Sequence, residues 1–171
     1  MSGQPLEIER KYLIRKPDAE LLRSLPEADM TEITQTYLKP DDTGMTRRVR
    51  KRGSDIKGWQ YTYTRKKHAG FGKRVELEDK ITETRYQVLL EEADPAKQPI
   101  SKVRWTFVYQ EQFFELDVYA FSDTLATLEI ELPDIDKPVN LPPQIAILAD
   151  VTGDSRFSNF SLSQALAFPA L

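Results

Sequence analysis

The chain alternates apolar and polar side chains over many short segments, which Gly and Pro residues separate. Residues i, i+2 and i+4 of a β-strand share one face, so this period of two predicts strands. The expected strands are 6–14, 32–39, 45–52, 58–66, 73–80, 101–109, 112–121, 125–132 and 149–152. About eight antiparallel strands in one chain of this length are typical of a closed barrel or a strongly curled sheet.

Helical patterns are fewer than strand patterns. Helices are expected at 17–25, at 83–93 and at 161–168, where Ser161 would cap the last one. A further helix is expected within 141–148. The fold class predicted from these elements is mainly β, with a few helices that cover the sheet.

The polar face of the expected strands carries mostly charged residues. Seven segments repeat a charged residue at every second position, each tending to one sign, with apolar residues between them. Arg10 and Lys51 depart from this alternation. The carboxylates on the charged face are Glu7, Glu9, Glu76, Glu78, Glu115, Asp117, Glu129 and Glu131, and the cations are Lys11, Arg48, Arg50, Lys66, Arg74, Lys102 and Arg104.

Two interpretations of this face remain open at this point. Charged strand faces usually lie in solvent, over an apolar face that forms the core. Like charges on one strand repel each other, however, unless something of opposite charge lies against them. In the second interpretation the charged face lines a barrel, where Arg and Lys bind phosphate oxygens and carboxylates bind Mg²⁺ or Mn²⁺. The apolar face would then point outward and be covered by helices or by a second copy in a homodimer.

Composition narrows the chemistry. The chain has 171 residues, expected to form one domain over 1–171, and a net charge of −3. It has no Cys and only one His, which excludes disulfides, thiolate catalysis and multi-His metal sites. A nucleic-acid partner is not expected at this net charge. The charged start of the chain and the lack of a long apolar stretch predict a cytoplasmic protein without membrane contact.

The ordered set of charged motifs resembles a known family. EIERKYL at 7–13 is similar to the E-x-E-x-K signature of the CYTH superfamily, the triphosphate tunnel metalloenzymes. Further blocks that resemble this family, in family order, are QTYL at 35–38, RVR at 48–50, TRK at 64–66, RVELE at 74–78, KVR at 102–104, ELDV at 115–118, LEIEL at 128–132 and DVTGDSRFSN at 150–159.

The resemblance implies an eight-stranded antiparallel tunnel that binds a triphosphate group and one or two divalent metal ions. The implied phosphate ligands are Lys11, Arg48, Arg50, Lys66, Lys102 and Arg104, to which the shared strand face adds Arg74. The implied metal ligands are Glu7, Glu9, Asp117, Glu129 and Glu131, to which the shared face adds Glu76 and Glu78. Lys11 and Tyr37 correspond to a pair thought to activate the attacking water in some bacterial members.

The function expected first is hydrolysis of inorganic tripolyphosphate to pyrophosphate and phosphate, with Mg²⁺ or Mn²⁺. Hydrolysis of a nucleoside or thiamine triphosphate and class IV adenylyl cyclase activity are enzymatic alternatives. A non-catalytic polyphosphate-binding module is a third, which the many carboxylates disfavour. The RVRKR segment adds cations at Arg47, Lys51 and Arg52, which strand parity puts partly outside the tunnel or near its rim. His68 is expected in an exposed loop, and Trp59 and Trp105 are expected to pack.

Overall fold

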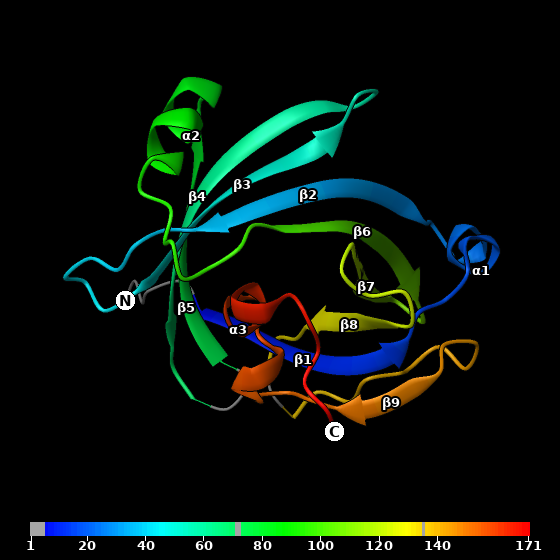
Figure 1. Cartoon of the computed structure of the whole chain (residues 1–171). Helices are drawn as coiled ribbons and strands as arrows, with labels where there is room; N and C mark the ends of the chain where they lie inside the picture. Colours follow the sequence, from blue (N-terminus) through cyan, green and yellow to red (C-terminus); the bar gives the residue numbers. More distant parts are fainter. Residues whose placement is uncertain (1–5, 71–72, 135) are drawn as a thin grey trace.

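Antiparallel strands form one sheet that closes on itself (Figure 1). The structure, a computed structural model, describes residues 6–70, 73–134 and 136–171, without the side chains of residues 6 and 7. The strands in this part of the chain are β1 (Leu6–Arg15), β2 (Asp29–Tyr37), β3 (Thr46–Ser54), β4 (Gly58–His68), β5 (Lys73–Ile81), β6 (Ile100–Tyr109), β7 (Gln112–Tyr119), β8 (Leu125–Glu131) and β9 (Ile147–Asp150).

The order of the strands fixes which walls face each other. The sheet runs β5-β4-β3-β2-β6-β7-β8-β1-β9, and a pairing of β5 with β1 closes the first eight strands into a barrel. β9 is an extra strand that pairs with the second half of β1. Counting around the ring, β3 lies opposite β8 and β1 lies opposite β2. The expected eight-stranded antiparallel barrel is confirmed.

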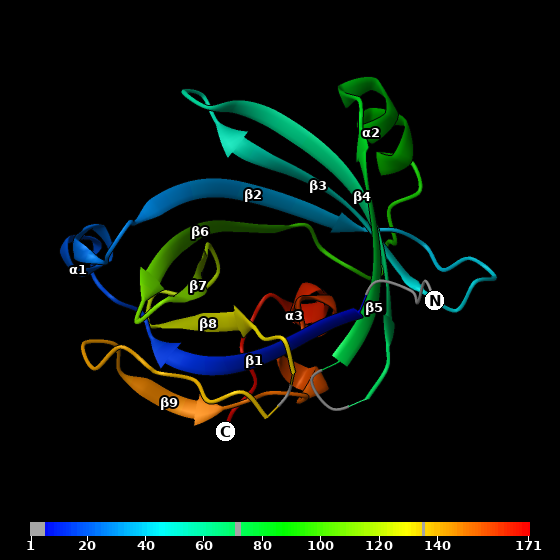
Figure 2. The ribbon, with the colours of Figure 1, turned by 180° about the vertical axis from the view of Figure 1, so that it is seen from behind.

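The helices begin at residues that accept a backbone hydrogen bond, as helix N-termini require. Asp18, Thr82 and Ser158 cap α1 (Ala19–Ser24), α2 (Glu83–Leu90) and α3 (Asn159–Ala165), and a 3-10 turn, η1 (Ser155–Phe157), precedes α3. In both views α2 lies outside the barrel beside β4, while α3 lies over the space that the strands enclose (Figures 1 and 2). Within the described ranges, no helix has the length and apolarity to cross a membrane.

Two helix expectations are wrong. The last helix begins at Asn159, because the Ser158 hydroxyl accepts from the amide of Ser161, and it ends before Leu166, whose φ is 49°. Residues 141–146 form turns instead of a helix, and residues 147–150 form β9. The adjacent Pro142 and Pro143 explain the second error, since proline supplies no backbone donor and restricts the residue before it.

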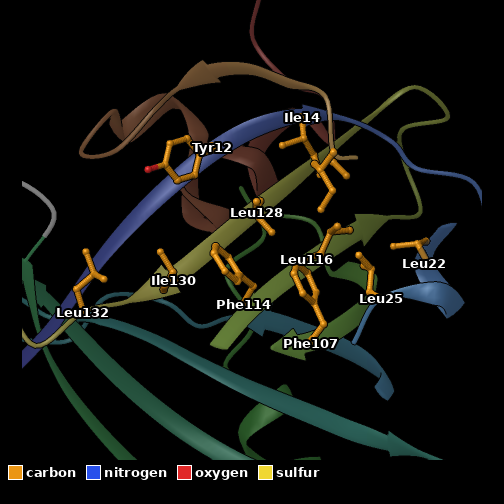
Figure 3. Packing of buried hydrophobic residues seen from close by; sticks show 12 residues of the cluster. Tyr12, Ile14, Leu22, Leu25, Phe107, Phe114, Leu116, Leu128, Ile130 and Leu132 are labelled. Carbon is orange, nitrogen blue, oxygen red and sulfur yellow. The ribbon is translucent and has the colours of Figure 1, made fainter. Parts of the chain in front are cut away.

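The largest apolar core lies outside the barrel wall. Figure 3 shows Phe107, Phe114, Leu116 and Leu128, from β6, β7 and β8, packed with Leu22 and other residues of α1 and β1. The rings of Phe107 and Phe114 stack at 5.2 Å between centroids. These residues have the strand parity opposite to that of the charged residues. The apolar face is therefore buried outside the barrel, and the charged face is free to line its interior.

Candidate active site

The barrel encloses a cavity of about 630 Å³ that is lined mainly by charged side chains. The cations that line it are Lys11, Arg48, Arg50, Arg52, Lys66, Arg74 and Arg104, and the carboxylates are Glu9, Glu76, Glu78, Glu115, Glu129, Glu131 and Asp154. The charged strand face thus forms the interior, as the second interpretation of the sequence predicts. The two exceptions point outward: Arg10 binds Asp150 of β9, and Lys51 lies 4.4 Å from the Trp59 ring centroid.

Arginines of β3 form a cationic wall. The Nε and Nη2 atoms of Arg50 donate to Gln35 Oε1 on β2, at 3.2 and 2.9 Å. Burial, with the nearby charges of Arg48 and Arg104, lowers the pKa of Arg50 to about 9. The buried Nε of Arg48 has no hydrogen-bond partner among the described residues. This wall is short of negative charge and suits an anionic ligand.

Carboxylates of β1 and β8 form the facing acidic wall. Burial and the neighbouring Glu129 charge raise the pKa of Glu9 to about 8. Burial opposes ionisation of Glu129 too, but the Lys11 ammonium, 3.4 Å from Glu129 Oε1, contributes to holding the pKa of Glu129 below its usual value. Arg74 lies 3.1 Å from Glu9. One of the two carboxyl groups therefore keeps a proton that a metal ion would displace.

The acidic wall fits a divalent metal that binds together with its substrate. Within the described residues, no three His, Asp or Glu side chains form a preassembled metal cluster. Glu9 and Glu129 nevertheless supply two adjacent carboxylates, and Glu129 Oε1 is buried without a hydrogen bond there. Mg²⁺ commonly takes one or two protein carboxylates and completes its shell with waters and substrate phosphates. The Glu7 side chain lies outside the described residues.

The other expected metal ligands have protein partners. Glu131 faces Glu9 in the β1–β8 register and lines the cavity, where it has further interactions. Glu76 lies 3.6 Å from Lys66, and Glu78 accepts from the Thr64 hydroxyl at 3.0 Å. Without substrate, the expected phosphate ligand Lys66 is therefore already paired with Glu76.

Asp117 holds two expected phosphate ligands inside the wall. Its carboxylate accepts from Lys102 at 2.7 Å and from Arg104 at 2.8 and 2.9 Å. Burial opposes its charge, but Arg104 and Lys102 bring the pKa of Asp117 below its usual range. Burial and two nearby arginines lower the pKa of Lys102 to about 7. Arg104 reaches the cavity surface, whereas Lys102 and Asp117 lie behind it.

Lys11 and Tyr37 line the cavity from opposite strands. The Lys11 ammonium donates to the Phe157 carbonyl at 3.1 Å and approaches Glu129. The Tyr37 hydroxyl accepts from Gln35 Nε2 at 3.3 Å. The barrel brings the expected pair to the same cavity, and each member has a partner of its own.

Helix α3 contributes residues that the sequence did not single out. Asn159 Oδ1 accepts from Tyr119 at 2.8 Å, and the Phe160 ring meets Tyr37 edge-on at 5.3 Å between centroids. Both lie at the cavity with Ser158. Ser158 and Asn159 end the DVTGDSRFSN block but have no expected role there, and Phe160 lies beyond that block. Gln35 could have been found from its parity with Tyr37. His68 is exposed as expected, but it is the last residue of β4 and not part of a loop, and it lines the cavity.

Comparisons with known proteins agree with this geometry. Residues 5–157 match the CYTH domain family. The crystal structure of the inorganic triphosphatase NE1496 has a TM-score of 0.60 and 26% identity, covering 96% of this chain and 97% of that chain. No curated protein matches significantly.

More distant structures share the fold. A putative adenylate cyclase from Bacillus halodurans has a TM-score of 0.56 and 18% identity, over 78% of this chain and 84% of that one. The PH1819 protein from Pyrococcus horikoshii has a TM-score of 0.55 and 19% identity, over 75% of this chain and 80% of that one. With a family match over most of its length and a charged antiparallel barrel, this chain belongs to the CYTH family.

Proposed function

We propose that this protein hydrolyses inorganic tripolyphosphate to pyrophosphate and phosphate, with Mg²⁺ or Mn²⁺. The observation that carries the proposal is the opposition of two walls in one cavity. On β3, Arg48 is buried and its Nε donates to none of the described residues, and on β1 and β8 the Glu9 and Glu129 carboxyl groups lie together. A ligand that carries several negative charges and a divalent cation complements both walls.

The cationic residues hold the phosphates. Arg48 and Arg50 bind phosphate oxygens from β3, and Arg104, oriented by Asp117, binds from β6. Lys66 and Arg74 exchange their carboxylate partners for the ligand. Phosphoryl transfer needs mainly positioning and neutralisation of charge, which several cations from different strands provide together. A bound metal ion would cancel further negative charge and polarise the phosphate oxygens.

Water attacks a terminal phosphorus atom, the bond to the bridging oxygen breaks, and pyrophosphate leaves. We assign the proton of the water to the deprotonated oxygen of Tyr37, which accepts it as general base and becomes the hydroxyl, while Lys11 lines the same cavity from the opposite strand. Gln35 positions both Tyr37 and Arg50, because its amide donates to one and its carbonyl accepts from the other. The Gln35 side chain therefore positions both the residue that takes the proton of the water and a residue that binds phosphate.

The inorganic substrate is favoured over organic ones by two features. NE1496, described as an inorganic triphosphatase, resembles this chain over nearly its full length. The aromatic rings of the cavity lining among the described residues are Tyr37 and Phe160, which pack against each other, and the imidazole of His68. Trp59 and Trp105 do not line it. The proposal includes a cytoplasmic location. That a second copy of the chain covers the outer apolar face in a homodimer stays a prediction.

Phosphate release from a substrate panel tests the proposal. Tripolyphosphate, ATP, thiamine triphosphate and pyrophosphate are each incubated with Mg²⁺, Mn²⁺ or EDTA. Fastest release from tripolyphosphate, only with metal, is the expected result. Faster turnover of an organic triphosphate would show that this compound, and not tripolyphosphate, is the substrate. Formation of cyclic AMP and pyrophosphate from ATP would indicate a cyclase. Tight binding of tripolyphosphate without turnover under every condition would indicate a non-catalytic polyphosphate-binding module.

A further inference from the structure

Arg52 continues the arginine row of β3 beyond the residues assigned to a triphosphate. It shares strand parity with Arg48 and Arg50 and lines the same cavity. It is partly buried, and in the described part of the chain it forms no hydrogen bond or ion pair. Its neighbour Lys51 points to the outer face, over Trp59. The row thus ends in an unpartnered guanidinium inside the cavity.

The row is longer than one triphosphate. Residues two apart on a strand are separated by about 6–7 Å, so the Cα atoms of Arg48 and Arg52 are about 13 Å apart. Each link between phosphorus atoms consists of two single bonds through one oxygen. Two such links, the whole phosphorus chain of a triphosphate, therefore span about one step of the row, from Arg48 to Arg50. Arg52 stands a further step along.

The chemistry of this extra step favours more phosphate over an organic group. A nucleoside would be held by stacking and by neutral hydrogen bonds, and the aromatic rings of the lining lie elsewhere, at Tyr37, Phe160 and, at the other end of β4, His68. Arg52 pairs on β2 with Ile33 and on β4 with Gln60, neither of which has a charge to neutralise it. A guanidinium in this setting matches a phosphate oxygen.

We propose that Arg52 forms an additional phosphate subsite, so that the tunnel binds linear polyphosphates of four or more phosphoryl groups more tightly than tripolyphosphate. This inference rests on the proposed function, because it takes Arg48 and Arg50 as the triphosphate ligands. It concerns affinity and chain length. It therefore remains testable without turnover.

The test is calorimetric titration with tripolyphosphate, tetrapolyphosphate and ATP in EDTA, at fixed ionic strength. Arg52→Gln is compared with Lys51→Gln, which removes the same charge from the next residue on the outer face. We expect Arg52→Gln to weaken tetrapolyphosphate binding about tenfold or more, as for one charge-assisted contact, and tripolyphosphate binding less than threefold. Lys51→Gln should leave the ratio of the two affinities unchanged, and thermal melting checks that both variants fold.

Three results would overturn the subsite: equal losses for both inorganic ligands, no loss for either, or a loss confined to ATP. The first would make Arg52 part of the triphosphate cradle, and the last would make it a nucleoside contact. Absence of hydrolysis with Mg²⁺ or Mn²⁺, beside the expected binding pattern, would refute the proposed function and leave the subsite intact.

Discussion

The carboxyl groups of Glu9 and Glu129 lie side by side on β1 and β8, and burial together with the Glu129 charge raises the pKa of Glu9 to about 8. The Lys11 ammonium favours the ionised form of Glu129, so the proton resides on Glu9. A shared proton is what two close carboxyl groups adopt when no cation separates them. This pair gives the acidic wall a measurable property in metal-free protein.

Glu9→Gln should change how stability depends on pH in chelator. Well below pH 4.5, the ordinary pKa of a glutamate, Glu9 is protonated in both the folded and the unfolded chain, and its contribution to the stability of the fold is fully present. As pH rises to about 8, the unfolded chain loses this proton first, so the wild type loses stability relative to Glu9→Gln, by a few kcal/mol in total. Urea unfolding at pH 5, 6, 7 and 8 measures the difference. Parallel curves would show that Glu9 ionises normally.

Glu129→Gln should abolish most activity while the barrel remains folded. The amide keeps the shape of the side chain but loses the negative charge that a divalent metal requires, so kcat should fall about 100-fold or more. Glu20→Gln, in the first turn of α1, is the matched control on an exposed carboxylate. Comparable phosphate release from both variants would remove Glu129 from the metal site.

Asp117→Asn should lower the stability of the fold, and this loss should be its main effect, not a loss of metal binding. Lys102 and Arg104 would be left beside a neutral amide in a buried site, and loss of one partner from such a network costs about 3 kcal/mol or more. Urea unfolding should show a much larger loss than Glu129→Gln. Unchanged stability with loss of metal dependence would instead make Asp117 a metal ligand, as the sequence motif implies.

Tyr37→Phe removes one hydroxyl and keeps the ring packed on Phe160. If Tyr37 takes the proton from water, kcat should fall about 100-fold and KM should change little, in the range of general-base contributions. Phe121→Tyr, an added hydroxyl on another ring near α3, serves as a control for packing. Steady-state kinetics on tripolyphosphate decide this, and an unchanged kcat would exclude Tyr37 as the base.

The strands and the grouping of the charged residues on one face could be predicted because both depend on a period of two, whereas the period alone left open whether that face points into the barrel or into solvent. Once Glu9, Lys11 and their counterparts share a parity, the apolar residues between them must face the other way, whatever the register. The helix expected within 141–148 does not form, because Pro142 and Pro143 supply no backbone donors there. The start of α3 was missed because Ser158 and Ser161 are both acceptable caps, and only the backbone path distinguishes them.

The state of each charged side chain could not be predicted from parity. Asp117 and Glu129 lie in similar motifs, but the β6–β7 register puts Asp117 opposite Arg104, while the β1–β8 register puts Glu129 opposite Lys11. The first pairing is satisfied within the wall, and the second leaves an oxygen without a hydrogen bond in the described structure. Register between distant strands, which parity does not encode, separates the two roles.

The proposed reaction is the cleavage of a triphosphate held between the two facing walls of the cavity. Phosphorus-31 NMR of tripolyphosphate incubated with the protein and Mg²⁺ tests it most directly, because substrate and both products give separate signals. We expect equal amounts of pyrophosphate and phosphate, no reaction in EDTA, and pyrophosphate that accumulates without further cleavage. Unchanged tripolyphosphate signals with Mg²⁺, together with no phosphate release in the presence of Mn²⁺, would contradict this reaction.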